Sequence, residues 1–134
     1  MFIDASALCA VLLGEPEHTE LELRIARAVD AVTSPVAVWE TVRAMVREQG
    51  VEVETALADV ERYLVVAEVR IVEIPARAHR FALEAFDRFG KGRHPAALNM
   101  GDCFAYACAR SHEVPLLFKG DDFTRTDIES ALTR

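Results

Sequence analysis

The most constraining feature of this sequence is the alternation of short apolar segments with longer stretches of helical periodicity. Residues 2–4, 31–33 and 114–118 are short and apolar, and residues 69–74 (V-R-I-V-E-I) alternate with the period of a strand. Parallel strands need long crossover connections, which are usually helices. The order therefore predicts an α/β fold, a three-layer α/β/α sandwich around a central, mostly parallel sheet.

The helix signals lie between these segments. Ser34 followed by Pro35 is typical of a helix start, and Gly50 marks the expected end of that helix. We expect the helix to turn its apolar residues inward, namely Val38, Trp39, Val42, Met45 and Val46. Further helices are expected over residues 5–14, from Pro16, over 53–64, from Pro75 and over 99–112.

Composition limits the class of protein. The chain has 134 residues, of which 51% are hydrophobic, enough for one core, so we expect a single domain over residues 1–134. Charged residues interrupt every apolar stretch, and Met1 is followed directly by Phe2 and Ile3, so we expect neither a membrane span nor a signal peptide. Its cysteines, at positions 9, 103 and 108, lie among apolar residues as in reduced cytoplasmic proteins.

The charge balance is acidic, with 15 Lys and Arg against 22 Asp and Glu. Sequence-independent binding of duplex DNA depends on neutralising phosphates, and an acidic chain is poorly suited to it. Nucleic acid is not excluded as a partner, because carboxylates that hold divalent cations also make a protein acidic. The cation then supplies the positive charge that a phosphate meets.

Several acidic residues fall where parallel strands end and helices begin. Asp4 ends the first expected strand, Glu40 lies in the first turns of the helix after the second, and Asp102 lies in the first turn of the helix from Asn99. Asp121 and Asp122 follow the last strand. An open parallel sheet gathers these positions at one rim, where such folds bind ligands.

Each acid also has a purely structural explanation. Asp4 is a favoured helix cap, and Asp102 forms a capping box if it bonds back to Asn99. Glu40 is spaced to pair with Arg43, and the two aspartates after the last strand suit a turn. Gathering all of them is unfavourable, however, because like charges oppose mutual ionisation. A hard divalent cation, Mg²⁺ or Mn²⁺, removes that cost and readies water for attack on a phosphodiester.

Other residues are candidates for holding substrate. Ser6, two residues after Asp4, is either an ordinary cap or a ligand for the scissile phosphate. Arg88, Lys91, Arg93 and His94 form the densest basic stretch, which is either an RNA-backbone contact or a solvated loop.

The sequence resembles a known family in four segments. They are F-I-D-A-S-A at residues 2–7, Glu40 after Ser34-Pro35, H-P-A-A-L-N-M-G-D-C-F-A-Y-A at residues 94–107, and L-L-F-K-G-D-D-F at residues 116–123. Together they are similar to PIN-domain ribonucleases, specifically VapC-type toxins of bacterial toxin–antitoxin modules. The resemblance implies a metal-dependent endoribonuclease, inhibition by a VapB-type antitoxin, and a homodimer.

The resemblance also implies the site. Asp4, Glu40, Asp102 and an acid after the last strand are the expected catalytic set, with Asp4, Asp102 and that last acid as metal ligands. Many PIN domains carry an acid two residues before the Asp-Phe pair, where this chain has Gly120. Asp122 is therefore the preferred fourth carboxylate, with Asp121 as its substitute.

Two rival functions stay open. One is a metal-free ribonuclease that uses two of the histidines at positions 18, 79, 94 and 112. The other is a PIN-like binding module that has lost catalysis and acts through a protein partner. For an active ribonuclease we expect a structured RNA with an exposed loop as substrate. An antitoxin helix would use an apolar groove along the first two helices and residues 53–64, although such stripes are more often core.

Overall fold

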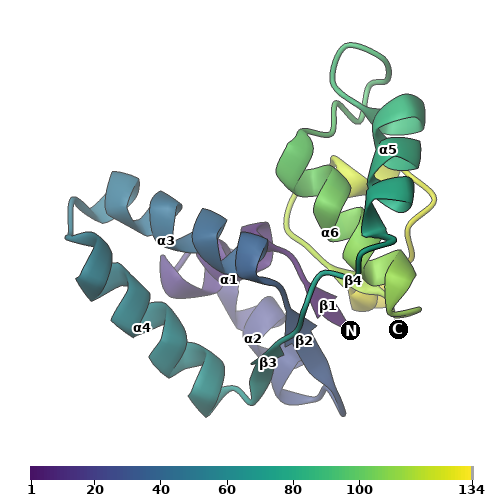
Figure 1. Ribbon diagram of the computed structural model, residues 1–134. Helices are drawn as coiled ribbons and strands as arrows, with labels where there is room; N and C mark the ends of the chain where they lie inside the picture. The colour runs from purple at the N-terminus through teal and green to yellow at the C-terminus, as the bar shows by residue number, and fades with distance from the viewer. Residues whose placement is uncertain (134) are drawn as a thin grey trace.

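The fold is built on a parallel sheet, shown in Figure 1 for a computed structural model that describes residues 1–133. Within these residues the sheet has four strands in the order β3-β2-β1-β4, all pairings parallel. The strands are β1 (Phe2–Ile3), β2 (Ala31–Thr33), β3 (Val69–Ile71) and β4 (Leu116–Leu117). Because the strands run in one direction, their carboxyl ends meet at one edge of the sheet.

Helices cover both faces of the sheet, which confirms the predicted α/β/α sandwich. They are α1 (Ala5–Leu12), α2 (His18–Ala26), α3 (Pro35–Gln49), α4 (Val53–Val66), α5 (Ala78–Phe89) and α6 (Met100–Ser111), with 3₁₀ turns η1 (Phe123–Arg125) and η2 (Ala131–Thr133). Figure 1 shows α1 to α4 on one side of the sheet and α5 with α6 on the other.

The strands alternate between two cores, as period-two side-chain geometry requires. Ile3 and Leu117 face a first core, which is packed by α1 to α4. Phe2 and Leu116 face a second core, packed by α5 and α6. The apolar stripes of α2 and α4 belong to the first core, so they do not form the exposed antitoxin groove considered above; they are Leu21, Ile25, Val60 and Leu64.

The strand predicted over residues 69–74 is shorter than expected. β3 ends at Ile71, although the Val72 N–H still donates to the Thr33 carbonyl at 2.9 Å. β3 is an edge strand with no further partner beyond it among the described residues. The next helix begins at Ala78 rather than at Pro75, because the Ala78 N–H donates to the Pro75 carbonyl in a turn. Alternation alone therefore overestimates the paired length of an edge strand.

The inward placement of Trp39 was wrong. Trp39 is 59% exposed, whereas Val38, Val42 and Met45 are buried as predicted. The buried face of α3 is centred on Thr41. Its hydroxyl donates to the Ala37 carbonyl at 2.7 Å, so the buried hydroxyl has a hydrogen-bond partner without water. A polar residue thus occupies the centre of the buried face, and the tryptophan lies at its side.

The described residues contain no helix long and apolar enough to cross a lipid bilayer. The cysteines at positions 9, 103 and 108 are free thiols, and burial raises the pKa of all three. They are therefore weak nucleophiles and belong to the packing of the helices.

Candidate active site

Asp4 lies at the centre of the site, directly after the inner strand β1. Its backbone N–H donates to the Leu117 carbonyl at 2.9 Å, which extends the pairing with β4 and fixes the residue at the sheet edge. Its carboxylate caps α1 and accepts from Ser6, from the backbone N–H at 3.1 Å and from the hydroxyl at 2.5 Å. The residue is only 4% exposed, and burial raises its pKa despite these hydrogen bonds.

Ser6 links two parts of the site. Its hydroxyl donates to Asp4 and accepts from the Lys119 backbone N–H at 3.1 Å, so it joins the start of α1 to the segment after β4. The Lys119 ammonium pairs with Glu15 and, at 3.7 Å, with Glu17. The capping role of Ser6 is thus present, and its contact with substrate stays a prediction.

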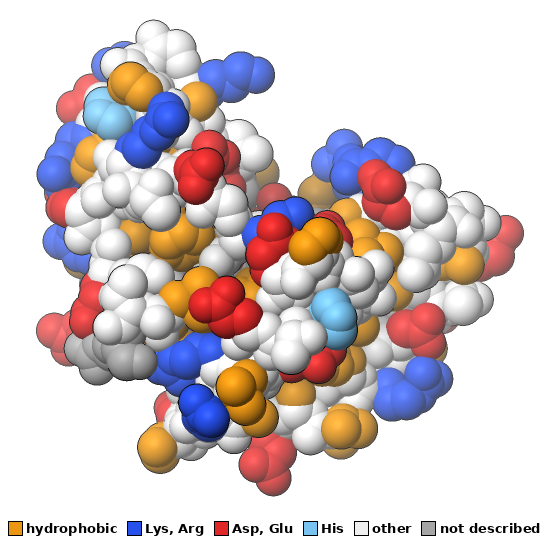
Figure 2. All heavy atoms as spheres, turned by 180° about the vertical axis from the view of Figure 1, so that it is seen from behind, with side chains coloured by type: hydrophobic (Ala, Val, Ile, Leu, Met, Phe, Trp, Pro, Cys, Tyr) orange, Lys and Arg blue, Asp and Glu red, His pale blue; other side chains and the backbone are white. Residues whose placement is uncertain are grey.

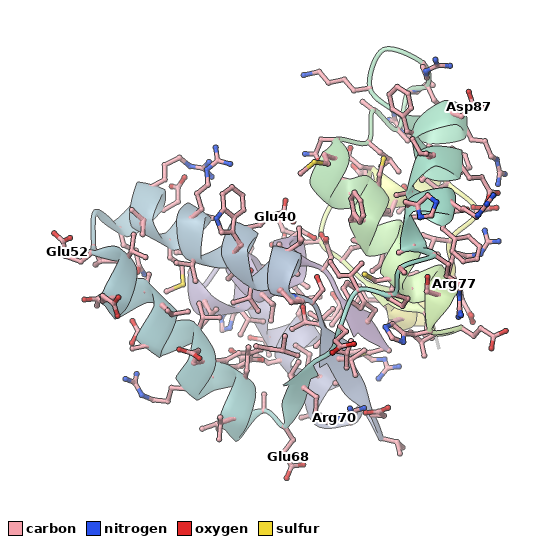
Figure 3. All side chains as sticks on the ribbon, viewed as in Figure 1. Glu40, Glu52, Glu68, Arg70, Arg77 and Asp87 are labelled. Atoms are coloured by element: carbon pink, nitrogen blue, oxygen red, sulfur yellow. The ribbon has the colours of Figure 1, made fainter. Side chains whose placement is uncertain are left out.

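Glu40 reaches the site from the opposite helical layer. Figure 3 shows it projecting from α3 toward α6. A methyl group added at Gly101 would lie 2.1 Å from Glu40 Oε2, so the carboxyl rests directly on the first turn of α6. Burial, together with the negative charges of Asp4 and Asp102, raises the pKa of Glu40 to about 7.

Asp102 completes the core of the site from α6. It forms the predicted capping box: its Oδ2 accepts from the Asn99 N–H at 3.1 Å, and its own N–H donates to Asn99 Oδ1 at 2.9 Å. Burial raises its pKa to about 6, with further contributions from the charges of Asp4 and Asp122. The capping role of Asp102 is thus present, and its role as a metal ligand stays a prediction.

The choice of Asp122 over Asp121 as the fourth acid stays a prediction. Both are exposed after β4, but only Asp122 acts on the pKa of Asp102. The buried ring of Phe123, packed 5.1 Å from the Phe118 ring centroid, holds Asp122 at the start of η1. Gly120, at the position where many PIN domains carry an acid, has φ of 96°, a backbone conformation that glycine adopts without strain.

The four acids have no basic ion-pair partners among the described residues. Within residues 1–133, no Lys or Arg forms an ion pair with Asp4, Glu40, Asp102 or Asp122. No three His, Cys, Asp or Glu side chains in that range are placed to hold one ion. The donor atoms of the four acids are all oxygen, which suits Mg²⁺ or Mn²⁺, and a divalent cation would offset the burial and the mutual repulsion that raise the pKa values of Asp4, Glu40 and Asp102.

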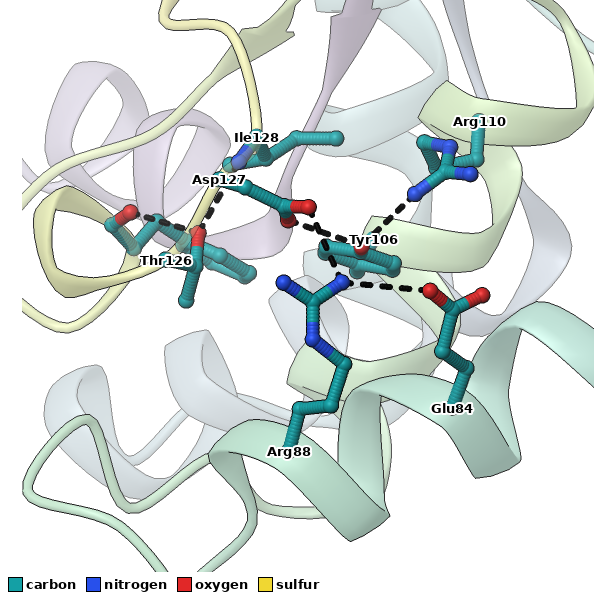
Figure 4. Close-up of polar contacts among 8 residues, drawn as sticks. Glu84, Arg88, Tyr106, Arg110, Thr126, Asp127 and Ile128 are labelled. Carbon is teal, nitrogen blue, oxygen red and sulfur yellow. Dashed lines mark hydrogen bonds and ion pairs between the residues drawn. The ribbon is translucent and has the colours of Figure 1, made fainter.

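Two of the predicted phosphate contacts already have acidic partners. Arg88 lies 3.1 Å from Glu84 and 3.0 Å from Asp127, in the network of Figure 4. Arg93 pairs with Asp87 at 3.1 Å. Lys91, by contrast, forms no ion pair within residues 1–133. The face in Figure 2 likewise shows basic and acidic side chains interspersed, without a continuous basic field.

The histidines are held separately. His79 Nδ1 lies 2.7 Å from the Ala76 carbonyl, and His94 Nδ1 accepts from the Ala96 N–H at 3.0 Å. His18 lies 3.5 Å from Glu22. Among the described residues, no hydrogen bond, ion pair or ring contact joins two histidines. The two-histidine mechanism therefore has no geometric support.

Two residues of the site were not predicted. Gly101 provides the space for the Glu40 carboxyl, and Trp39 is exposed beside it. Glycine within a helix costs about 1 kcal/mol relative to alanine and indicates a packing requirement, so Gly101 carried a usable signal. No sequence signal indicated that Trp39 is exposed, because its spacing along the helix fits the buried stripe.

The comparisons with known proteins agree with this fold. Residues 1–129 match the PIN domain. A Ribonuclease VapC of Mycolicibacterium smegmatis is 39% identical over 128 residues, covering 96% of this chain and 97% of that protein. Ribonuclease VapC42 of Mycobacterium tuberculosis is 35% identical over 134 residues, covering 99% and 100%. The chain belongs to the PIN-domain family and, within it, to the VapC ribonucleases.

A solved structure confirms the architecture. VapC20 of Mycobacterium tuberculosis, described as a sarcin-ricin loop cleaving toxin, superposes with a TM-score of 0.74. The match covers 95% of each chain at 19% identity. This likeness shows that the two proteins share a fold.

Proposed function

We propose that this protein is a Mg²⁺- or Mn²⁺-dependent endoribonuclease toxin. The observation that carries the proposal is the placement of Asp4, Glu40 and Asp102 at the carboxyl edge of the parallel sheet, where their charges act on one another and no Lys or Arg among residues 1–133 forms an ion pair with them. Membership among the VapC ribonucleases supports the activity, and the cytoplasm is the compartment in which such an enzyme meets RNA.

Asp4, Asp102 and Asp122 would hold the metal, directly or through water, with Asp121 as the substitute for Asp122. The bound metal supplies a polarised water and neutralises charge at the phosphate. Glu40 orients that water and accepts its proton, a task suited to a carboxyl whose pKa lies at about 7. Ser6 holds the Asp4 carboxylate in place and keeps its oxygens turned to the site.

The substrate is RNA, and its 2′-hydroxyl takes no part in the reaction. Attack by water leaves a 5′-phosphate and a 3′-hydroxyl, rather than the cyclic phosphate that internal attack produces. Lys91 is the cation best placed to hold a phosphate, because Arg88 and Arg93 each have acidic partners. Sequence-specific proteins read unpaired RNA, so we propose a structured RNA with an exposed loop.

The test is cleavage of a mixed RNA pool by purified protein with Mn²⁺, beside Asp4→Asn and Asp102→Asn. We expect cleavage by the wild type, 5′-phosphate ends, loss of activity with EDTA, and at least about a 100-fold loss in both variants. Cleavage that persists in EDTA, or equal cleavage by all three proteins, would refute the metal mechanism. A silent binding module would leave the RNA intact in every lane.

Inhibition by a VapB-type antitoxin follows from the same electrostatics. We propose that an antitoxin Arg or Lys reaches the uncompensated carboxylates and displaces the cation. Such a contact removes metal and blocks the phosphate position in one step. Co-purification with the antitoxin should therefore lower the Mn²⁺ affinity of the toxin, and substitution of that basic residue should restore it.

Self-association is also proposed, over the apolar face of α5 and α6. There Leu83, Phe86 and Met100 are 62%, 44% and 71% exposed, around an apolar groove of about 510 Å³ that Phe104 also lines. Exposed apolar surface of this kind marks protein contacts. A dimer in solution that Leu83→Glu converts to a monomer would support this arrangement, and a monomeric wild type would exclude it.

A further inference from the structure

A second groove adjoins the carboxylates. It has a volume of about 600 Å³, and its lining includes Trp39, Arg43, Glu40, Met100, Gly101 and Pro35. Volumes of about 300–1,000 Å³ are usual for ligand sites. Glu40 belongs both to this groove and to the acidic site, so a ligand that lies in the groove ends at the reacting phosphate.

The groove has an aromatic face and an adjacent cation. Trp39 is 59% exposed, and the Arg43 guanidinium lies 5.3 Å from the centre of its ring. Arg43 forms no ion pair within residues 1–133, and its charge lowers the pKa of Glu40 only in part. The guanidinium lies over one face of the indole without an acidic ion-pair partner among residues 1–133. The two side chains match a nucleotide, whose base stacks on the face of the indole that Arg43 leaves uncovered and whose phosphate pairs with Arg43.

We propose that Trp39 and Arg43 form a nucleotide subsite, in which an unpaired base of the RNA stacks on Trp39 next to the cleaved bond. The inference rests on the proposed ribonuclease function and adds the residues that position the substrate. Stacking suits an acidic protein, because it provides affinity that does not depend on a broad basic surface. It also explains why an indole remains in solvent beside a half-buried glutamate.

The subsite can be tested without cleavage, because Trp39 is the only tryptophan in the chain. In an Asp102→Asn background with Mn²⁺, single-stranded RNA of mixed sequence should quench the tryptophan fluorescence as it binds. Polyphosphate, which carries the charge but no bases, should not. Equal quenching by both polymers, or binding of RNA without quenching, would overturn the stacking arrangement.

A second experiment measures how strongly variants of Trp39 bind RNA. Trp39→Ala should weaken RNA binding about 5- to 150-fold, the range for loss of one stacked base, and Trp39→Phe should recover part of the loss. Once the cleaved bond is mapped, an RNA lacking the adjacent base should bind wild type and Trp39→Ala equally. Val65→Ala, which shortens a 78% exposed side chain on α4, is the matched control and should bind as the wild type does.

These outcomes separate the subsite from the ribonuclease function. If the wild type cleaves RNA in a metal-dependent way and Trp39→Ala cleaves equally well, the subsite is wrong and the ribonuclease function is supported. If the protein cleaves no RNA but RNA still quenches Trp39, the subsite is supported and the ribonuclease function is wrong. If Trp39→Ala instead converts a dimer to a monomer with unchanged activity per site, the groove is a contact between copies of the chain and the proposal is wrong.

Discussion

Two groups of carboxylates in this molecule are placed in opposite electrostatic surroundings. Asp127 accepts from the Tyr106 hydroxyl at 2.8 Å and pairs with Arg88, while Arg110 donates to the same tyrosine at 2.8 Å (Figure 4). Burial alone would raise the pKa of Asp127, but these hydrogen bonds lower it below its usual value.

At the sheet edge the balance is reversed. Asp4 and Asp102 are buried or half-buried, their hydrogen bonds come from neighbouring residues of the chain and not from Lys or Arg, and their pKa values are raised. The chain has basic side chains available, as the Asp127 network shows. Among residues 1–133 none of them forms an ion pair with the acids at the sheet edge, and only the charge of Arg43 acts on Glu40, so the lack of ion pairs there is a property of the site and not of the composition. Acids that stabilise a fold are paired, and acids left for a ligand are not.

The largest effect expected from a single methyl group is that of Gly101→Ala. The added Cβ would overlap the Glu40 carboxyl and move it away from Asp102, so we expect a 10- to 100-fold loss of cleavage. Alanine favours the helix, and stability should change by less than about 1 kcal/mol. Cleavage rates and thermal unfolding measure the two effects. If Glu40→Gln and Gly101→Ala lose activity additively in the double variant, the two residues do not act together.

The pH dependence of cleavage should report the acids at the sheet edge and not Asp127. Glu40 and Asp102, with pKa values of about 7 and about 6, must lose their protons to accept a proton and to hold metal. At subsaturating Mn²⁺, activity should fall at least about 10-fold from pH 7 to pH 5. Higher Mn²⁺ should move the fall to lower pH, because protons and metal compete. A profile that is indifferent to Mn²⁺ concentration would contradict this.

Asp127→Asn should have a structural effect only. The variant loses the negative charge that Arg88 and Tyr106 share, which we expect to lower the free energy of unfolding by about 1 kcal/mol. Cleavage should stay within about twofold of the wild type when both proteins are folded. Urea unfolding and RNA cleavage report the two quantities, and a large loss of activity in a stable variant would place this network in the active site.

Asp102→Asn should raise the free energy of unfolding of the metal-free protein, whereas Asp127→Asn lowers it. The folded-state pKa of Asp102, about 6, lies above its ordinary 3.8, so ionisation between these values lowers stability as pH rises. Removing the charge should therefore stabilise the chain at pH 7 by about 1 kcal/mol, discounted for partial exposure, and have no such effect near pH 4. Added Mn²⁺ should raise the melting temperature of the wild type more than that of the variant.

The sequence was sufficient to predict the acidic rim because the rule behind it is topological. Asp4 follows β1, Asp102 lies in the first turn of α6 and Glu40 lies in the second turn of α3, and parallel pairing brings the ends of strands and the starts of the helices after them to one edge. The cap of α3 by Ser34 and the capping box of Asn99 and Asp102 are local, and they were predicted for the same reason.

What could not be predicted depends on packing between elements. The exposure of Trp39 depends on which face of α3 meets the sheet, and a stripe centred on Thr41 is not visible in a pattern of apolar residues. Arg88 looked available in the sequence because Asp127, its partner, is 39 residues away. The close contact between Gly101 on α6 and Glu40 on α3 is between two helices of opposite layers.

The division of the molecule into two cores determines when it can become toxic. Asp4 comes from the sheet, Glu40 from the layer packed on the first core, and Asp102 from the layer packed on the second. The proposed site therefore draws its carboxylates from both halves of the molecule. A ribosome must therefore release most of the polypeptide, and both layers must dock, before the product can attack the RNA of the cell that makes it.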